Sequence, residues 1–323
     1  MIKEKIVSIQ SPFGEPVALY KNAWDGGKTD DSLSIVGGLH GDQLNGLYIA
    51  SRLTRFLQAV QEKREEGFRL QGKIQIFPIA NPQAMQSGSQ VWSFDGLDMD
   101  LAFPGNEYGE VADKLCHALL RHTADSTYGI VLSSGIRHYE DFPHIQIFRP
   151  DRKLKKFARS LELSAVREIP DSALIRIQLL PQWVERGVVP AILAWGKADT
   201  LARTHCDAVF DGLVNMMLST GLLTHPSRKG RKTEIEFFEA KRERSIVATQ
   251  AGLFVPEAQV GDSVAKGQRL GVMRDIYSGE CVEEFTAPED GLLVTLRSHP
   301  LAYEKEPIAI LLAGEKTARF RPF

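Results

Sequence analysis

The segment 34–46 constrains the fold more than any other part of the sequence, because it joins an apolar run to a helical pattern through a tight turn. Residues 34–36 form an apolar run that is typical of a buried strand, and two glycines then permit a sharp turn. His40 and Gln43 follow before the helical pattern begins at Leu44. A histidine and a second polar side chain three residues later, at the mouth of a strand, are spaced so that both can reach one metal ion.

The chain before residue 230 alternates apolar runs with amphipathic patterns. Six further segments carry these patterns: helices over 44–60 and 107–121, and strands over 74–79, 128–132, 144–148 and 191–194. Apolar strands that are separated by helices are typical of a mostly parallel sheet covered on both faces, which predicts an α/β fold. Ligands bind such sheets beyond the carboxyl ends of the strands. We therefore expect the chemistry at four strand ends: His40, Asn81, Ser133 and Ala194.

The C-terminal part of the chain has a different pattern, with short strands between closely spaced Gly and Asp turns. The phrases at 261–268 and 287–291 resemble the lipoyl- and biotinyl-like barrel. Such barrels carry their cofactor on a lysine at a hairpin tip, but residues 275–284 contain no lysine. We therefore expect a structural β-barrel-like domain rather than a cofactor carrier.

A chain of 323 residues is long for one domain, so two are predicted. They are an α/β domain over 1–230 and a β domain over 233–323. The basic run at 228–232 contains no aromatic residues and is interpreted as a solvated linker rather than a nucleic-acid contact. The formal net charge of −2 likewise gives no reason to expect nucleic acid or an anionic membrane as a partner.

The three cysteines, Cys116, Cys206 and Cys281, are scattered and form no C-x-x-C pair. This argues against a disulfide framework or a thiolate zinc site and suits a reducing cytoplasm. No signal-peptide pattern and no apolar run long enough for a membrane span is evident. A cytoplasmic protein is the expectation.

Residues 38–46, Gly-Leu-His-Gly-Asp-Gln-Leu-Asn-Gly, resemble the first zinc motif of the succinylglutamate desuccinylase/aspartoacylase family, a branch of the zinc carboxypeptidases. The family motif is G-x-H-G-x-E-x-N-G, in which the His and the Glu bind zinc. This resemblance implies a zinc-carboxypeptidase-like fold with a C-terminal β domain. It also places His40 at the first ligand position and Gln43 at the second.

At the positions that the resemblance assigns to the family's remaining zinc ligand and its catalytic residue, this chain carries residues that are unsuited to those roles. The second histidine ligand belongs to a D-L-H-S-G phrase, which here reads Val-Leu-Ser-Ser-Gly and puts Ser133 in its place. The catalytic glutamate belongs to an E-x-G phrase that ends a late strand, and Ala194 occupies it. A neutral amide and a hydroxyl are poor zinc ligands, and alanine cannot transfer a proton.

The substrate-binding positions implied by the resemblance are also altered. The phrase D-L-N-R-x-F-P-G appears as Asp-Met-Asp-Leu-Ala-Phe-Pro-Gly, so Asp100 replaces an asparagine and Leu101 replaces the arginine that grips a substrate carboxylate. Asn81 is retained before a proline, whereas Gln90 stands where a further arginine is usual. An acidic substrate would be repelled by this arrangement.

Two hypotheses follow. In the first, the chain is a non-catalytic member of the family that binds no cofactor and acts as a binding or regulatory subunit, paired with an active paralogue or with itself as an oligomer. In the second, it is a zinc-dependent hydrolase of N-acyl amino acids or related amides with a rearranged metal site, drawn from His40, Asp42, Asp100, His138 and His144.

Simpler interpretations exist for two members of that rearranged set. Asp42 is suited to cap the helix that begins at Leu44, and His138 to lie on an exposed loop. A serine nucleophile at 133–135 has little support, because no G-x-S-x-G elbow surrounds it.

Overall fold

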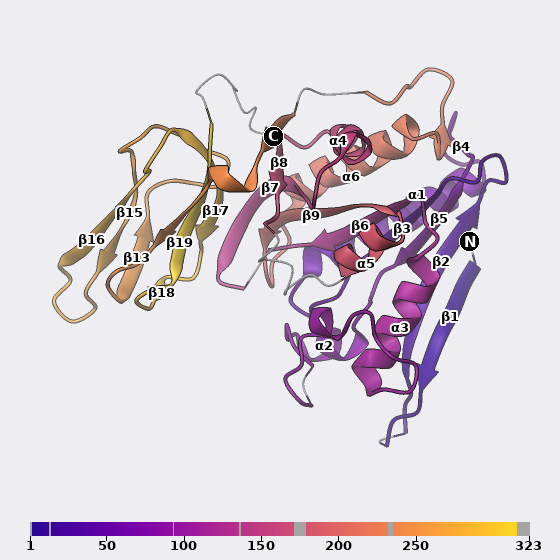
Figure 1. Cartoon of the computed structure of the whole chain (residues 1–323), viewed down its shortest axis with the longest axis horizontal. Helices are drawn as coiled ribbons and strands as arrows, with labels where there is room; N and C mark the ends of the chain where they lie inside the picture. Colours follow the sequence, from indigo (N-terminus) through magenta and orange to yellow (C-terminus); the bar gives the residue numbers. More distant parts are fainter. Residues whose placement is uncertain are drawn as a thin grey trace.

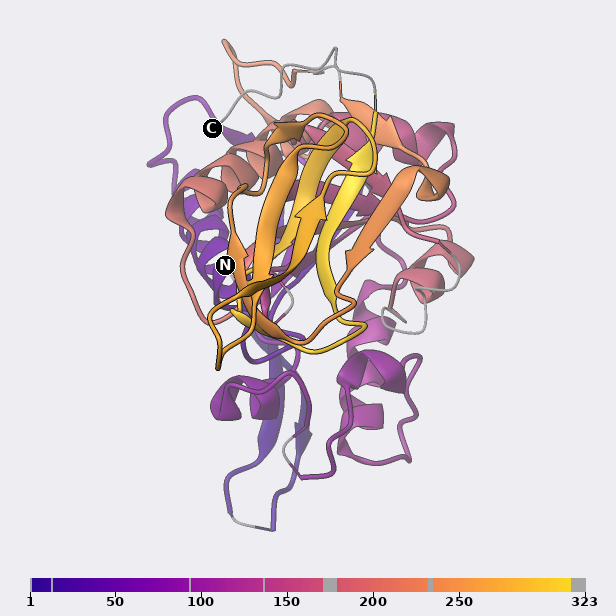
Figure 2. The ribbon, with the colours of Figure 1, turned by 90° about the vertical axis from the view of Figure 1, so that its left-hand side faces the viewer.

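The structure is a computed structural model that describes residues 2–12, 14–92, 94–135, 137–170, 179–231 and 235–314. Figure 1 shows an α/β region with a smaller group of strands at one end of the long axis, and Figure 2 looks onto that end. The helices are α1 (Leu44–Gln61), α2 (Pro82–Ser87), α3 (Val111–Thr123), α4 (Arg152–Arg159), α5 (Leu179–Glu185) and α6 (Arg203–Ser219), with 3₁₀ turns η1 (Met99–Ala102) and η3 (Ala240–Arg242).

One large mixed sheet organises the molecule, and its longest path of neighbouring strands runs β1-β2-β5-β3-β6-β9-β7-β17-β19-β12. These strands are β1 (Ile2–Ile9), β2 (Val17–Asp25), β3 (Ser32–Val36), β5 (Lys73–Phe77), β6 (Tyr128–Ser133), β7 (Tyr139–Ile147), β9 (Val189–Lys197), β12 (Glu243–Val247), β17 (Gly291–Arg297) and β19 (Pro307–Ala313). Strands β5, β3, β6 and β9 are parallel, and β1, β2, β7 and β17 add antiparallel pairs. The predicted α/β class with a mostly parallel, helix-covered central sheet is confirmed.

Both faces of the central strands are buried, which explains why their sequences lack polar alternation. Ile130 and Leu132 face the core formed with α1, α4 and α6, whereas Val131 faces the core formed with α3 and α5. The predicted helix over 107–121 begins later, at Val111, because Glu110 and Asp113 form a capping box there. The predicted strand at 144–148 is the end of the longer strand β7.

The C-terminal strands pack as two facing layers. A separate four-stranded sheet contains β13 (Gly252–Pro256), β15 (Arg269–Arg274), β16 (Cys281–Thr286) and β18 (Leu301–Ala302). Phe254 and Phe285 from this sheet pack with Leu293 and Leu311 of the large sheet in one apolar core. The prediction that β structure follows the α/β region is confirmed, and the structure shows that the strands of this separate sheet pair antiparallel.

Five short strands complete the topology: β4 (Arg69–Leu70), β8 (Ala165–Glu168), β10 (Leu223–Thr224), β11 (Glu236–Phe238) and β14 (Ser263–Val264). The division into domains at 1–230 and 233–323 stays a prediction. Strand β17 joins the two parts by pairing with β7. Residues 232–234, where the predicted boundary falls, and 315–323 lie outside the described residues.

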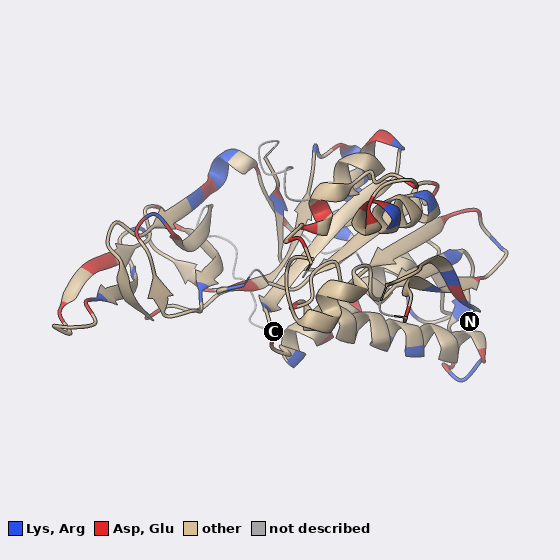
Figure 3. Cartoon of the chain, turned by 90° about the horizontal axis from the view of Figure 1, so that it is seen from below, with Lys and Arg blue, Asp and Glu red and all other residues tan. Residues whose placement is uncertain are grey.

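Charged residues of both signs are interspersed along the chain (Figure 3), as the small net charge predicts. Within the described residues, no helix is long and apolar enough to cross a membrane.

Candidate functional site

The three positions of the expected metal site lie together at the carboxyl ends of neighbouring strands. His40 follows β3 and Ser133 ends β6, while Gln43 immediately precedes α1. The Gln43 Nε2 atom lies 3.0 Å from His40 Nδ1 and 3.3 Å from Ser133 Oγ. The Gln43 amide therefore links the other two side chains by hydrogen bonds. The three positions therefore lie together, and their role as metal ligands stays a prediction.

The turn around His40 is held in shape by backbone packing and hydrogen bonds that do not require a metal. The Gly41 backbone donates a hydrogen bond to Ser89 O at 2.7 Å, and a Cβ atom on Gly41 would lie only 1.8 Å from Ala84 O. Gly38 has a positive φ of 62°, which glycine adopts without strain. Close packing of this turn against α2 thus requires the glycines whether or not a metal binds.

Asn45 has a second structural role in the same motif. Its side chain is fully buried, and its Nδ2 donates to Lys197 O at 3.2 Å while its Oδ1 accepts from Ala202 N at 2.7 Å. These bonds join the start of α1 to the loop between β9 and α6. The asparagine of the motif therefore has a structural role that requires no metal.

The opposite edge of the His40 ring faces two carboxylates. His40 Nε2 lies 3.2 Å from Asp98 Oδ1 and 3.7 Å from Asp100 Oδ2. Asp98 also begins η1, where its Oδ1 accepts a hydrogen bond from Asp100 N at 3.0 Å. Sequence reasoning missed Asp98. Its signal was the Asp-Met-Asp phrase, in which the 3₁₀ turn brings the alternate aspartates to one side.

Burial and charge act against each other in this cluster. Burial lowers the pKa of His40, but the nearby Asp98, Asp100 and Asp42 carboxylates raise it, and the net shift is upward. Asp100 is only 4% exposed, and burial raises its pKa to about 7 although His40 partly opposes this. The cluster thus combines a histidine whose pKa is raised with an innermost carboxyl group, that of Asp100, which is reluctant to ionise.

The prediction that Asp42 caps α1 is wrong. The N-cap residue is Gln43, and no side chain there caps the helix, because Gln43 directs its amide to His40 and Ser133. Asp42 is buried, and its backbone oxygen accepts a hydrogen bond from Asp199 N at 2.9 Å. Burial raises the pKa of Asp42, whereas His40 and Gln90 lower it. Gln90 therefore lies next to the site.

The two other histidines of the rearranged set have partners elsewhere. His138 lies in a turn with its ring centroid 4.5 Å from that of His299, and it is half-buried rather than exposed as expected. His144 is fully buried in β7, where Nδ1 lies 2.8 Å from Phe142 O and Nε2 lies 3.0 Å from Gln146 Nε2. Burial lowers the pKa of His144 to about 3, so the ring is neutral.

Ala194 is at the position expected for the catalytic base. It pairs in register with Ser133 on β6 and with His144 on β7, and it is 3% exposed. Residues opposite each other on neighbouring strands point to the same face, so Ala194 presents only a methyl group next to Ser133. His144 is the nearest imidazole in that register, but both of its nitrogens are engaged.

The predicted substrate-binding positions surround the same strand ends. Asn81 caps α2 by accepting a hydrogen bond from Ala84 N at 3.1 Å, and its buried Nδ2 atom has no hydrogen-bond partner among the described residues. Leu101, in η1 beside Asp100, is 48% exposed. The loop that would carry a cation toward a substrate therefore presents an exposed apolar side chain and a buried acid.

A zinc ion does not fit the three family ligand positions as they stand. Protein zinc sites use imidazole nitrogens, thiolates and carboxylates, whereas His40 is here accompanied by an amide and a hydroxyl. The amide nitrogen of Gln43, a donor, faces the Nδ1 atom of His40. In the described part of the chain, the one group of three His, Cys, Asp or Glu residues whose ligand atoms all lie within 4.8 Å is His40, Asp98 and Asp100.

Comparison with known proteins identifies related sequences and folds. Residues 29–169 match the model of the succinylglutamate desuccinylase/aspartoacylase catalytic domain. The N-alpha-acetyl-L-2,4-diaminobutyric acid deacetylase of Halomonas elongata is 23% identical over 284 residues, which cover 86% of this chain and 80% of that protein. The matched range of the catalytic domain contains His40, Gln43 and Ser133 and ends before Ala194.

Solved structures show the same fold along nearly the whole chain. The product-bound ectoine utilization protein EutE (DoeB) from Ruegeria pomeroyi gives a TM-score of 0.80 at 17% identity, covering 96% of this chain and 94% of that one. A succinylglutamate desuccinylase/aspartoacylase from Rhodobacter sphaeroides gives 0.78 at 17% identity, with 96% and 93% covered. An aspartoacylase family protein from Mesorhizobium loti gives 0.77 at 20% identity, with 96% and 92% covered.

Proposed function

The chain belongs to the succinylglutamate desuccinylase/aspartoacylase family, and we propose that it is a non-catalytic member that acts as a binding or regulatory subunit. The observation that carries this proposal is the Gln43 amide, whose nitrogen lies at hydrogen-bond distance from both His40 Nδ1 and Ser133 Oγ. A hydrogen-bond network therefore occupies the side chains that family members use for zinc.

The missing base supports the same proposal. Amide hydrolysis needs a group that takes a proton from the attacking water and delivers it to the leaving amine. Ala194 provides none, and the adjacent His144 is neutral with a pKa lowered to about 3 by burial. Without the zinc ligands and the base, the chain can neither hold the metal nor transfer the proton, although the strands that carry these positions remain paired.

The altered charge of the pocket supports a change of ligand. An arginine fork would bind a carboxylate with two parallel hydrogen bonds, but Leu101 offers none. Asp98 and Asp100 add acidic groups next to His40. A binding subunit with this pocket would disfavour acidic small molecules. We propose an active paralogue, or a second copy of this chain, as its partner.

Metal analysis tests the proposal directly. Protein purified without chelators should contain far less than one zinc per chain when measured by mass spectrometry. Restoring the chemistry in the triple variant Gln43→Glu, Ser133→His and Ala194→Glu should produce uptake of about one zinc per chain, because an imidazole and a carboxylate then join His40. Circular dichroism would establish that the triple variant is folded.

The single variant Gln43→Glu is the matched control. It restores one carboxylate but neither the second imidazole nor the base, so we expect neither stoichiometric zinc nor hydrolysis of N-acetyl amino acids from it. Stoichiometric zinc in the wild-type protein, together with hydrolysis that His40→Ala abolishes, would contradict a non-catalytic role.

A second candidate function is favoured by one observation, the cluster of His40, Asp98 and Asp100. One imidazole and two carboxylates are a donor set that divalent metals accept, and a bound ion would polarise a carbonyl group. The chain would then be a zinc-dependent hydrolase of N-acyl amino acids or related amides. The named activity of the Halomonas elongata relative belongs to this class.

The two candidates differ in how they respond to Asp98→Asn. In the hydrolase, this variant should release the metal and abolish activity, because it removes a carboxylate ligand. In the non-catalytic subunit, it should leave the low metal content unchanged.

A further inference from the structure

A cavity of about 370 Å³ lies between the edge strand β1 and helix α3. Its strand wall is made by residues 6–9, and its helix wall by side chains of α3 that include Lys114, Ala118 and Arg121. This volume is within the range of small-molecule pockets in proteins. None of the residues at the candidate site lines this cavity.

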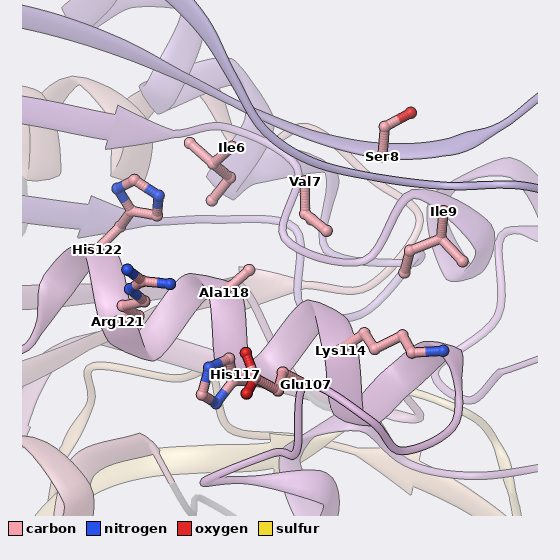
Figure 4. A pocket seen from close by; sticks show the side chains of 10 residues that line it. All are labelled: Ile6, Val7, Ser8, Ile9, Glu107, Lys114, His117, Ala118, Arg121 and His122. Atoms are coloured by element: carbon pink, nitrogen blue, oxygen red, sulfur yellow. The ribbon is translucent and has the colours of Figure 1, made fainter.

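A β-bulge shapes the strand wall. The pairing of β1 with β2 shifts register between Lys5 and Val7, so Ile6 is the extra residue. Bulges of this kind redirect side chains from their regular alternation. Figure 4 shows Ile6, Val7 and Ile9 directed from β1 toward α3, whereas Ser8 points away. The apolar side chains of Ile6, Val7 and Ile9 thus line one side of the cavity.

The opposite wall carries positive charge without partners. Neither Lys114 nor Arg121 has an ion-pair or hydrogen-bond partner among the described side chains, although both line the cavity. The one acidic residue of the lining, Glu107, is engaged by the Tyr108 hydroxyl, whose pKa that interaction raises. Arg121 also lowers the pKa of the neighbouring His122 ring, although burial and Lys21 lower it more.

We infer that this cavity binds a small amphipathic anion, namely an aliphatic carboxylate. Its hydrocarbon chain would lie along Ile6, Val7 and Ile9, and its carboxylate would be held by Arg121, while Lys114 adds positive charge about two helical turns away, at the other end of the cavity (Figure 4). Arginine matches a carboxylate in geometry, and a few charged groups at one side of an apolar pocket fix the orientation of such a ligand. Burying the chain provides the remaining affinity.

The inference does not depend on the proposed function. Helix α3 separates the cavity from η1, which contacts the helix through the Cys116 Sγ hydrogen bond to Met99 O at 3.3 Å. Occupancy of the cavity can therefore be measured whether or not His40 binds a metal. A hydrolase and a non-catalytic subunit would give the same result.

Isothermal titration calorimetry with sodium octanoate tests the inference on the full chain. The wild-type protein should bind one octanoate per chain, with an affinity that falls as salt is added. Arg121→Gln should weaken binding about tenfold or more, because a charge-assisted hydrogen bond is lost. Ala118→Phe should weaken it similarly by filling the cavity. Lys153→Gln, an exposed position on α4, is the matched control and should change nothing.

Two further ligands separate the contributions of chain and head group. Octanamide tests the hydrocarbon chain without a charge, and inorganic phosphate tests an anion without a chain. Both should bind at least tenfold more weakly than octanoate. The inference is overturned if octanoate does not bind at millimolar concentration, if phosphate binds as well as octanoate, or if Arg121→Gln, folded by circular dichroism, binds octanoate like the wild type.

Discussion

Gln43 has the length of a glutamate but not its charge, and this difference changes the state of its neighbours. When the His40 ring is neutral, this amide nitrogen can donate to Nδ1, and Nε2 is then the nitrogen that donates to Asp98. The imidazole that would present Nδ1 to a metal is thus held by protein groups on both edges.

At the same scale, His144 predicts a pH dependence of stability. Its pKa is lowered to about 3 in the folded protein, against about 6.5 when unfolded, so the unfolded chain binds more protons as the pH falls below 6.5. From pH 7 to pH 5, the free energy of unfolding of the wild type should fall by about 2 kcal/mol relative to His144→Gln. Urea unfolding at both pH values measures this, and parallel pH profiles would contradict it.

Asp141 should show the opposite sign. Burial raises its pKa to about 6, although its hydrogen bond from Thr295 Oγ1 at 2.5 Å opposes the shift, so the folded protein retains a proton that the unfolded chain loses. As the pH rises from 4 to 6, the free energy of unfolding of the wild type should fall by about 2 kcal/mol relative to that of Asp141→Asn. The same urea titrations measure this, and a relative gain with rising pH would exclude the assignment.

At the scale of elements, the first motif acts as a clamp between helices and strands. Gly46 lies where a Cβ atom would be 3.2 Å from Leu132 O, so α1 packs closely on β6. Asn45 extends the contact to the loop before α6. These contacts give the glycines and the asparagine of the motif a structural role that does not depend on a metal.

Removing the Asn45 side chain should therefore be costly. In Asn45→Ala, the half-buried Ala202 N–H and Lys197 carbonyl lose their partner, and we expect a loss of about 2–4 kcal/mol in unfolding free energy. Asn22→Ala is the control, since Asn22 makes one long bond of 3.4 Å to Thr54 at a half-buried position. It should cost less than about 1 kcal/mol. Equal losses in urea unfolding would refute a special role for Asn45.

At the scale of the whole molecule, the large sheet continues from the α/β region into the C-terminal strands. Strand β17 pairs with β7 through Thr295–Asp141, Leu296–Glu140 and Arg297–Tyr139. Arg297 is 3% exposed and ion-paired with Glu306 at 2.9 Å, so a buried charge also lies at this junction. The two parts share backbone hydrogen bonds rather than a flexible connection.

This continuity predicts one cooperative unfolding transition. Differential scanning calorimetry should give a calorimetric enthalpy about equal to the van't Hoff enthalpy, because neither part can unfold without exposing the paired edge of the other. Two separate transitions would instead support independent domains on either side of residue 230.

Much of the architecture could be predicted from the sequence, because the burial of each central strand is recorded in its own composition. Apolar runs near 34–36, 128–132 and 191–194 are buried on both faces by helices, and that environment leaves a readable composition. The convergence of His40, Gln43 and Ser133 was also predictable, because parallel strands end at the same edge. Asp98 was missed, since only the 3₁₀ turn η1 brings it to His40.

The sequence alone determined which chemical groups are present at the strand ends, because the functional group of a side chain is fixed by its covalent structure. Only the tertiary structure decided how those groups are used. It turned Gln43 toward His40 instead of capping α1 with Asp42, enclosed His144 in β7, and formed the cavity between β1 and α3. These outcomes depend on contacts between residues far apart in the chain, which no local pattern records.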